Sequence, residues 1–490
     1  MKPDFQVGIV GAGFAGVIAA LRLKQTGRDS FVIFEKAKEV GGTWRDNVYP
    51  GCACDVPSNL YSISFEPNPN WQRMYSSQRE ILDYLKNVVR KHDLDKRIRY
   101  DSEILKYEFD EQFGWWKLTD RDGVTTIVRT VIIAMGPFNR PQLPKIKGRE
   151  SFAGKALHSA RWDESYELKN KRVAVIGTGA SAVQIVPAIA PEVAQLTVFQ
   201  RSAAWIGTRM DAEIPVETRR RYGKYPFIQS FWRGFLYWLL ELRGRMFIGN
   251  RTIHKYFHKL SLQKLENEVE NPETRRKLTP DYKLGCKRIL SSDDYLPTFN
   301  RENVALETDS ISEINRDGIV TTNGVQHNFD AMIFATGFEV ADITTEMRVY
   351  GRNGRELFQE WQTKGLQAYK GMTISGYPNL AFILGPNSGL GHSSMIYMME
   401  KQVDYIIKYL TILDNKPENS FLDLKPEVQR KYNRVIHDQF QNTLWASGCK
   451  SWYINAAGRN TTLYPRLTWH FRRRTKRIDE GEYEFVQLIR

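Results

Sequence analysis

The sequence predicts an α/β protein with two Rossmann-like dinucleotide-binding domains and a helical insertion. Two observations carry this prediction. A strand, a glycine-rich turn, a helix and a second strand follow one another twice, first around Gly11 and again around Gly177. Each copy is followed by a hairpin signal and a buried strand with matching spacing. Duplication of one unit, interrupted by a segment that fits neither copy, accounts for most of the 490 residues.

The first unit lies at the N-terminus. The apolar run FQVGIV ends in GAGFAG, a helix-like segment follows, and a second apolar run, FVIF, stops at Glu35. In this fingerprint the first glycine makes the tight turn, the second lets a pyrophosphate approach the backbone, and the third lets the helix pack closely. The Glu35 carboxylate can accept hydrogen bonds from both hydroxyls of a ribose. We therefore expect a dinucleotide to bind at Gly11, Gly13, Gly16 and Glu35.

The second unit repeats the pattern with one change of charge. KRVAVIG leads into GTGASA, a helix-like segment and the run LTVF, so that the expected cofactor contacts are Gly177, Gly179, Ser181 and Ala182. Glu35 lies 24 residues after Gly11, and Arg201 lies 24 residues after Gly177. A carboxylate would repel a 2′-phosphate, whereas a guanidinium binds one. We therefore expect a dinucleotide without a 2′-phosphate in the first unit and NADP in the second.

The repetition extends downstream of both fingerprints. Asp122-Gly123 is a hairpin signal and precedes a strand that ends in AMG at Gly136. Asn323-Gly324 precedes a strand that ends in ATG at Gly337, after the same interval of 13 residues. Two dinucleotide folds in one chain imply electron transfer between two cofactors.

Charge and cysteine content limit the remaining classes. The formal net charge is +14, but Lys and Arg are spread along the chain, so we expect no nucleic acid partner. The chain has four cysteines, at positions 52, 54, 286 and 449, which are too few for a disulfide scaffold. Cys52, Cys54, Cys286 and Cys449 also lack the spacing of zinc ligands, so we expect no metal. The start of the chain has no leader pattern, and no apolar run approaches the ~20 residues of a membrane span. These features favour a cytoplasmic protein.

Residues 206–284 fit neither unit and are rich in aromatic and Arg residues. Phe231, Phe235, Trp238 and Leu242 recur at helical spacing, which predicts core packing within a helical insertion. The alternative is weak contact with a membrane surface.

Several further motifs resemble those of one family. FAGKALHSARWD matches the signature of the Baeyer-Villiger monooxygenases, a group of the class B flavoprotein monooxygenases, through Phe152, Gly154, His158, Trp162 and Asp163. The resemblance extends over most of the chain and includes EKAKEVGGTW, YPGCACDVPS, FQRSAAW, CKRIL, ATGF, GPNSGLGHSS and SWYINAAGRNTTLYP.

The resemblance implies an activity. FAD reduced by NADPH would react with O2 to give a flavin peroxide, which inserts one oxygen atom next to a ketone carbonyl and yields an ester or lactone. Arg288 matches the active-site arginine of the family and would stabilise the peroxide and the oxyanion of the adduct. Asp55 matches the carboxylate that orients it. His158 would act as a hinge residue rather than as a proton carrier, and the enzyme would be a monomer or homodimer.

The resemblance also implies cofactor contacts. Arg201, Ser202 and Lys287 would surround the 2′-phosphate of NADP, and Trp452 would lie on a mobile loop that closes over NADP and substrate. The segment GPNSGLGHSS would aim a helix N-terminus at the flavin. The other implied contacts are Gly42, Thr43, Trp44, Tyr49, Thr336, Gly337 and Asn387.

These assignments predict a division of the chain into six segments. The FAD-binding domain would comprise 1–142 and 336–490, the NADP-binding domain 163–205 and 285–335, the signature linker 143–162, and the helical insertion 206–284.

Three alternatives remain open at this point. A flavin monooxygenase that oxidises amines or sulfides would share the fold and both cofactors. A dithiol reductase is suggested by GGTW followed by Cys52 and Cys54, although Trp44 stands where the first cysteine of that motif would be. Net charge alone suggests a non-enzymatic binder of nucleic acid.

Overall fold

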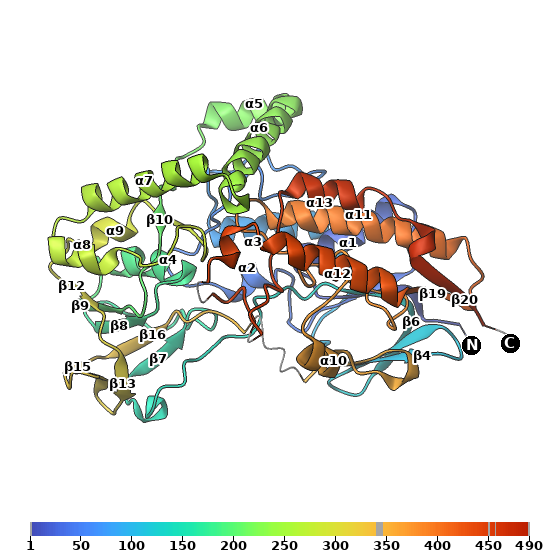
Figure 1. The fold of residues 1–490 in the computed structure, drawn as a ribbon, viewed down its shortest axis with the longest axis horizontal. Coiled ribbons are helices and arrows are strands. Elements are labelled where there is room, and N and C mark those ends of the chain that lie inside the picture. The colour runs from blue at the N-terminus through green and yellow to red at the C-terminus, as the bar shows by residue number, and fades with distance from the viewer. Residues whose placement is uncertain (1, 340–345, 449–450, 456, 489–490) are drawn as a thin grey trace.

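Two β-sheets, each covered by helices, form the body of the molecule (Figure 1). The computed structural model describes residues 2–339, 346–448, 451–455 and 457–488. The first sheet has the order β17-β4-β5-β6-β1-β2-β3, with β18 beside β6, and the second has the order β12-β9-β8-β16-β7. The prediction of an α/β fold with two Rossmann-like sheets is confirmed.

The strands of the first sheet come from both ends of the chain. They are β1 (Phe5–Val10), β2 (Phe31–Phe34), β3 (Ile98–Arg99), β4 (Ile104–Asp110), β5 (Trp115–Asp120), β6 (Thr125–Ile133), β17 (Arg348–Tyr350) and β18 (Leu380–Phe382). Helices α1 (Phe14–Gln25), α3 (Gln78–Lys91) and α11 (Met395–Asp414) contribute to one large core against this sheet. The runs FQVGIV and FVIF form the neighbouring parallel strands β1 and β2, and every residue of β2 is buried, as is typical of a parallel strand covered on both faces.

The second sheet is built only from the middle of the chain. Its strands are β7 (Lys155–His158), β8 (Arg172–Ile176), β9 (Gln195–Phe199), β12 (Val304–Glu307) and β16 (Ala331–Phe334), and all of the pairings are parallel. Helices α4 (Ala180–Ile189) and α9 (Tyr295–Thr298) pack in its core. The FAGKALHSARW signature therefore does more than connect the two units, because its residues 155–158 form an edge strand of this sheet.

The two units repeat the same turn in detail. The Gly11 amide donates to the Phe34 carbonyl at 2.8 Å, and the Gly177 amide donates to the Phe199 carbonyl at 3.1 Å. Both glycines have a positive φ, of 107° and 117°. A Cβ on Gly11 would lie 2.7 Å from the Ala134 carbonyl oxygen, and one on Gly177 would lie 2.5 Å from that of Ala335. Only glycine fits either turn.

Each unit also carries an antiparallel meander at the predicted place. In the first unit it is β4-β5-β6, and in the second it is β13 (Ile311–Ile314), β14 (Gly318–Thr321) and β15 (Gln326–Asn328). Gly123 and Gly324, at the two hairpin signals, both have φ of 85°.

The chain passes between the units at one place. The Gln142 amide donates to the Gly337 carbonyl at 2.9 Å, and the Glu339 amide donates to the Arg140 carbonyl at 3.1 Å. An antiparallel bridge joins Pro141 and Phe338. The outgoing and returning segments are therefore paired side by side.

The remaining elements complete the body. They are α2 (Thr43–Asp46), α10 (Leu357–Lys364), α12 (Pro426–Phe440), α13 (Thr468–Thr475), the pair β10 (Ile206–Gly207) and β11 (Leu290–Ser291), and the hairpin of β19 (Ser420–Leu424) with β20 (Tyr483–Gln487). Among the described residues, no helix is both long and apolar enough to cross a bilayer. Cys52 and Cys54 are free thiols, Cys286 is disulfide-bonded, and Cys449 lies outside the described residues.

The segment between the two parts of the second unit is helical, as expected. It contains α5 (Val216–Lys224), α6 (Pro226–Gly244), the 3-10 turn η3 (Arg245–Ile248), α7 (Arg251–Glu268) and α8 (Pro272–Leu278). Helices α5 and α6 project from the body (Figure 1). The prediction of core packing is wrong for Phe231, Phe235, Trp238 and Leu242, which are 79%, 49%, 61% and 51% exposed. Their spacing correctly places them on one helix face, but that face points away from the protein.

Candidate active site

A loop of the first unit carries the predicted carboxylate to the second unit. The Tyr49 hydroxyl donates to Gln184 Oε1 on α4 at 2.9 Å, and Gln184 Nε2 donates to the Ala53 carbonyl at 2.9 Å. A Cβ on Gly51 would lie 2.6 Å from the Gln184 carbonyl oxygen. The loop is thus clamped onto α4, and Asp55 follows it at the junction of the units. This places Tyr49 as a link between the units, with Ser181 close to its hydroxyl.

Asp55 and Arg288 form an ion pair at this junction. Arg288 Nη2 donates to Asp55 Oδ2 at 2.5 Å, and Arg288 Nε donates to the same oxygen at 3.2 Å. Both side chains are about a third exposed. The Asp55 charge raises the pKa of Arg288, so the guanidinium is positive at every physiological pH. Burial alone would raise the pKa of Asp55, but the Arg288 charge outweighs it and holds that pKa below its usual value.

Two more arginines surround this pair, and sequence reasoning missed both. Arg243 on α6 is half-buried, its loss of solvent lowers its pKa, and its charge interacts with Tyr75, Asp55 and Arg288. Arg209 Nη2 donates to the Cys54 carbonyl at 3.1 Å, next to Asp55. The charges of Arg288 and Arg243 therefore both act on the Asp55 carboxylate, and Arg209 lies next to it at the Cys54 carbonyl. Sequence alone does not distinguish Arg243 from Arg233, the other arginine of α6, because its contacts with Asp55 and Arg288 arise only in the folded chain.

Tyr453, also missed from the sequence, brings a hydroxyl to Arg288. Its side chain is buried, and the Arg288 charge interacts with its phenol. Burial raises the pKa of Tyr453 to about 12, so the phenol is neutral. Within the described part of the chain this hydroxyl has no hydrogen bond of good geometry. Trp452 is 41% exposed, and its ring centroid lies 4.4 Å from that of Tyr453 and 6.0 Å from that of Phe138.

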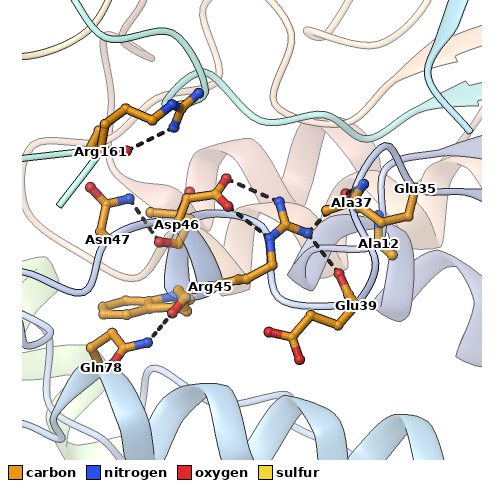
Figure 2. A network of polar contacts seen from close by, with 12 residues as sticks. Ala12, Glu35, Ala37, Glu39, Arg45, Asp46, Asn47, Gln78 and Arg161 are labelled. Carbon is orange, nitrogen blue, oxygen red and sulfur yellow. Dashed lines mark hydrogen bonds and ion pairs between the residues drawn. The ribbon is translucent and has the colours of Figure 1, made fainter. Parts of the chain in front are cut away.

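A network of charged residues around Glu35 lies beside the first glycine loop (Figure 2). Glu35 Oε2 accepts from the Ala12 amide at 2.9 Å, and Oε1 accepts from the Ala37 amide and Arg45 Nη1, both at 3.0 Å. A carboxylate has about four acceptor positions, so roughly one remains for a ligand. Glu35 can therefore bind one ribose hydroxyl as it stands, and the second requires Arg45 to give up its bond. Arg45 is a further residue that the motif did not identify.

Next to this network, the start of α2 lies against the first glycine loop. Gly42 precedes Thr43 at the start of α2, and a Cβ on Gly42 would lie 3.3 Å from the Gly13 Cα. Trp44 Nε1 donates to the Tyr61 hydroxyl at 3.1 Å. A Cβ on Gly16 would lie 1.9 Å from the Gly11 carbonyl oxygen, so this glycine serves helix packing. The surface beside Gly13 stays accessible to a ligand.

The second glycine loop is open as well. A Cβ on Gly179 would meet no atom within 4 Å, and Ala182, in the third glycine position, is fully buried. Arg201 is exposed and has no hydrogen bond or ion pair among the described residues. Lys287 Nζ donates to Ser202 Oγ at 3.2 Å. Burial lowers the pKa of Lys287, and the nearby Arg201 charge lowers it further. Arg201 and Lys287 are thus neighbouring cations, an arrangement that favours an anion, while the Asp281 carboxylate acts on Lys287 in the opposite direction.

The signature residues lie around the crossing between units. The His158 ring is buried against the backbone of Gln142 and Gly337, the two paired crossover segments. Its Nδ1 accepts from the Ala160 amide at 3.0 Å, so the proton of the neutral ring is on Nε2. Burial lowers the pKa of His158, which therefore stays neutral at pH 7. These contacts fit a hinge residue.

The other signature residues support the same segment. A Cβ on Gly154 would lie 2.6 Å from the Asp330 carbonyl oxygen, so the chain needs glycine there. Phe152 and Trp162 are half-buried and pack against the cores of the second unit. Asp163 pairs with Lys155 Nζ at 2.6 Å, and hydrogen bonds from Lys155 and Ser165 lower its pKa to about 2.

Two predicted contacts have structural partners of their own. Thr336 Oγ1 donates to the Gln142 carbonyl and so helps to hold the crossover. Asn387 Nδ2 donates to the carbonyls of Asn460 and Leu463, at 2.9 and 3.0 Å. Asn387 therefore fixes the segment after Trp452, and its amide nitrogen is occupied.

Some buried polar atoms have no hydrogen-bond partner among the described residues and so indicate where a polar ligand can bind. The hydroxyls of Ser393 and Ser394, just before α11, are buried and have no hydrogen-bond partner among the described residues. The same is true of Ser159 Oγ, which follows β7. Buried polar atoms are normally paired, so the two serine hydroxyls fit a polar ligand at the N-terminus of α11. The residues of both glycine loops, with Glu35 beside the first and Arg201 and Lys287 beside the second, are compatible with a dinucleotide in each unit.

The two free cysteines do not fit redox chemistry. Cys54 is fully buried, and burial raises the pKa of its thiol; burial also raises the pKa of Cys52 to about 12. Reactive cysteines need a thiolate, which these environments suppress. The geometry thus gives no support to the dithiol alternative.

Known proteins are similar to this chain over most of its length. A family model described as pyridine nucleotide-disulphide oxidoreductase matches residues 8–223. A Baeyer-Villiger monooxygenase of Pseudomonas aeruginosa is 45% identical to the chain over 483 residues, which cover 98% of this chain and 91% of that protein. One of Streptomyces coelicolor is 42% identical over 484 residues, covering 98% and 93%.

The fold is also similar to solved structures. Oxidized steroid monooxygenase bound to NADP has a TM-score of 0.86 and 27% identity, with 99% of both chains covered. Cyclohexanone monooxygenase from Rhodococcus sp. Phi1 bound to NADP+ has a TM-score of 0.88 and 26% identity, with 99% of this chain and all of that one covered.

Proposed function

This chain belongs to the Baeyer-Villiger monooxygenases, and from that premise we propose that it oxygenates a ketone with Arg288 and Asp55 as its catalytic pair. It is an NADPH-dependent flavoprotein, with FAD and NADP as its cofactors. In the overall reaction one atom of O2 enters the bond between the carbonyl carbon and its neighbour, which gives an ester or lactone. The other atom leaves as water, with the hydride of NADPH and a proton from solvent.

The Arg288–Asp55 pair is the observation that carries the assignment. FAD, when bound, supplies the activation of oxygen. As an oxygen atom attacks the ketone, negative charge develops on the carbonyl oxygen, and a guanidinium N–H placed there stabilises it. Asp55 holds Arg288 by Nε and Nη2, so Nη1 is left to donate to the substrate. Because the Asp55 bonds fix the guanidinium before substrate arrives, little reorganisation is needed during the reaction.

The charge of the site favours ketone oxygenation over oxidation of amines or sulfides. Attack on a carbonyl needs an anionic oxygen nucleophile, whereas heteroatom oxidation needs a protonated, electrophilic one. Arg243 and Arg209 add positive charge beside the pair and so favour the anionic form. Heteroatom oxidation remains the second candidate function, since it uses the same cofactors.

The cofactors would be held by the two glycine loops. Glu35 and the Gly13 backbone would bind FAD in the first unit, with the N-terminus of α11 near its ring. Arg201, Ser202 and Lys287 would bind the 2′-phosphate of NADPH in the second.

The test is turnover of NADPH and O2 by the FAD-loaded enzyme against linear, cyclic and aryl ketones and a matched thioether. We expect ester or lactone, detected by mass, in an amount that accounts for the NADPH oxidised. Sulfoxide formed in preference to ester across the panel would move the assignment to the heteroatom class.

A further inference from the structure

An exposed apolar face runs along α6. Phe227, Phe231, Phe235, Trp238, Leu239 and Leu242 are each between 49% and 79% exposed. At 100° per residue they fall within about 120° of the helix surface, so they form one continuous stripe. With ~200 Å² per aromatic side chain, the exposed patch is on the order of 600 Å², at the upper end for a monomer. A patch of this size marks an interaction surface.

The opposite face of α6 is fixed to the body. The Thr468 hydroxyl on α13 donates to Glu241 Oε1 at 2.7 Å, and Gln229 Nε2 donates to Asn59 Oδ1 at 2.8 Å. Arg233 Nη1 donates to the Asn59 and Ser62 carbonyls, at 2.8 and 3.0 Å. The helix therefore cannot turn its apolar face inward without breaking these bonds, and the exposure of that face is built into the fold.

The surface around the stripe is basic. Helix α5, which packs against α6, carries Arg219, Arg220, Arg221 and Lys224, and Arg245 is exposed beyond the end of α6. One carboxylate, Glu217, lies 3.5 Å from Arg220 and 3.4 Å from Arg221, so positive charge is left over. The only other carboxylate between residues 216 and 248, Glu241, is buried.

We propose that α5 and α6 dock the enzyme onto an anionic membrane surface. The Phe, Trp and Leu side chains of α6 would enter the boundary between headgroups and acyl chains, while the arginines of α5 bind anionic headgroups. Since no described helix can span a bilayer, the contact is peripheral. This inference goes beyond the proposed function and does not depend on the substrate.

A second copy of the chain fits the same face less well. Two copies would bring the arginines of two α5 helices close together, in a protein whose formal net charge is already +14. A patch of roughly 600 Å² is also below the ~800 Å² per partner of a standard stable interface. Anionic lipid, by contrast, complements both the charge and the flat aromatic stripe.

The experiment is co-sedimentation of the FAD-loaded enzyme with vesicles. Vesicles of phosphatidylcholine alone are compared with vesicles that contain about one-quarter phosphatidylglycerol, at about 50 and about 300 mM salt. We expect binding to the anionic vesicles that weakens as salt rises. Arg220→Glu/Arg221→Glu and Phe231→Ser/Trp238→Ser should each weaken it at least about tenfold. Lys145→Glu/Arg316→Glu, an equal charge change at exposed residues elsewhere, should bind like the wild type.

A second measurement does not depend on the folding of the serine variant. Lipids with brominated acyl chains should quench part of the tryptophan fluorescence of the wild type, and Trp238→Phe should bind vesicles but lose most of that quenching. The proposal is overturned by any of three results: no binding to anionic vesicles at low salt, undiminished quenching in Trp238→Phe, or a dimer in solution that Phe231→Ser/Trp238→Ser dissociates.

Discussion

Arg288 Nη2 lies 2.5 Å from Asp55 Oδ2, although the two residues are 233 positions apart in the chain. Asp55 belongs to the first unit and Arg288 to the second, so the pair forms only when the units are assembled against each other. The candidate active site therefore lies at the interface of the two units, and its residues can be tested separately from those that would bind either cofactor.

Replacing Arg288 should uncouple the two halves of the reaction. In Arg288→Ala we expect ester formation to fall about 100-fold or more, equivalent to about 3 kcal/mol of transition-state stabilisation. NADPH should still be oxidised, with hydrogen peroxide released in place of ester. Arg288→Lys should recover only part of the activity, since an ammonium lacks the planar fork. Ester and peroxide formed per NADPH are the measurements, and wild-type coupling in the alanine variant would refute the mechanism.

Asp55 should make stability depend on acid pH. Because the folded pKa of Asp55 is below its unfolded value of about 3.9, the pair stabilises the fold above that pH and loses the contribution as pH falls through the folded pKa. We expect the wild type to be more stable than Asp55→Asn at pH 7, with the difference shrinking below about pH 4. Thermal unfolding of both proteins between pH 7 and 3 tests this. A difference that stays constant with pH would mean that the Asp55 charge does not contribute.

Arg201 should set the preference for NADPH. Loss of a charge-assisted hydrogen bond of about 2 kcal/mol corresponds to a roughly 30-fold higher KM for NADPH in Arg201→Ala. The KM for NADH should hardly change, because NADH has no 2′-phosphate. Lys287→Ala should act in the same direction, and Arg316→Ala is a matched exposed control. Equal effects on both nucleotides would remove Arg201 from the phosphate site.

His158 should act without titrating between pH 7 and 9. Its folded pKa is lowered, so protonation costs stability, and the wild type should lose stability relative to His158→Gln as pH falls below about 6.5. The variant should retain FAD and lower ester formation by a factor that is constant from pH 7 to 9. A pH profile that loses a group near pKa 6.5 in the variant would instead assign His158 to proton transfer.

Tyr453 should matter for oxygenation and hardly at all for folding. Its buried hydroxyl has no good partner among the described residues, so Tyr453→Phe should leave the free energy of unfolding unchanged or slightly higher. If the hydroxyl serves substrate or cofactor beside Arg288, ester formation should fall about tenfold while NADPH oxidation continues. Unchanged coupling would limit Tyr453 to shaping the wall of the site.

The sequence could predict features that depend on local spacing. The two glycine turns, the hairpins at Gly123 and Gly324, and the charge contrast between Glu35 and Arg201 are all set by a few neighbouring residues. Arg243, Arg45 and Tyr453 could not be found in this way, because their roles arise from contacts between distant segments. The same reason explains the error at Phe231 and Trp238. Helical spacing defines which residues share a face, but only the packing of α6 on α13 and on residues 59–62 decides where that face points.

The paired crossover at Gln142 and Gly337 makes the second unit an inserted module. Every strand of the first sheet lies before residue 142 or after residue 336, and every strand of the second lies between them. A shortened chain that joins 142 directly to 336 would keep the whole first sheet together, since the two ends already lie side by side. The second unit could then be exchanged as a whole for that of a relative, and the preference for NADPH or NADH would be expected to change with it.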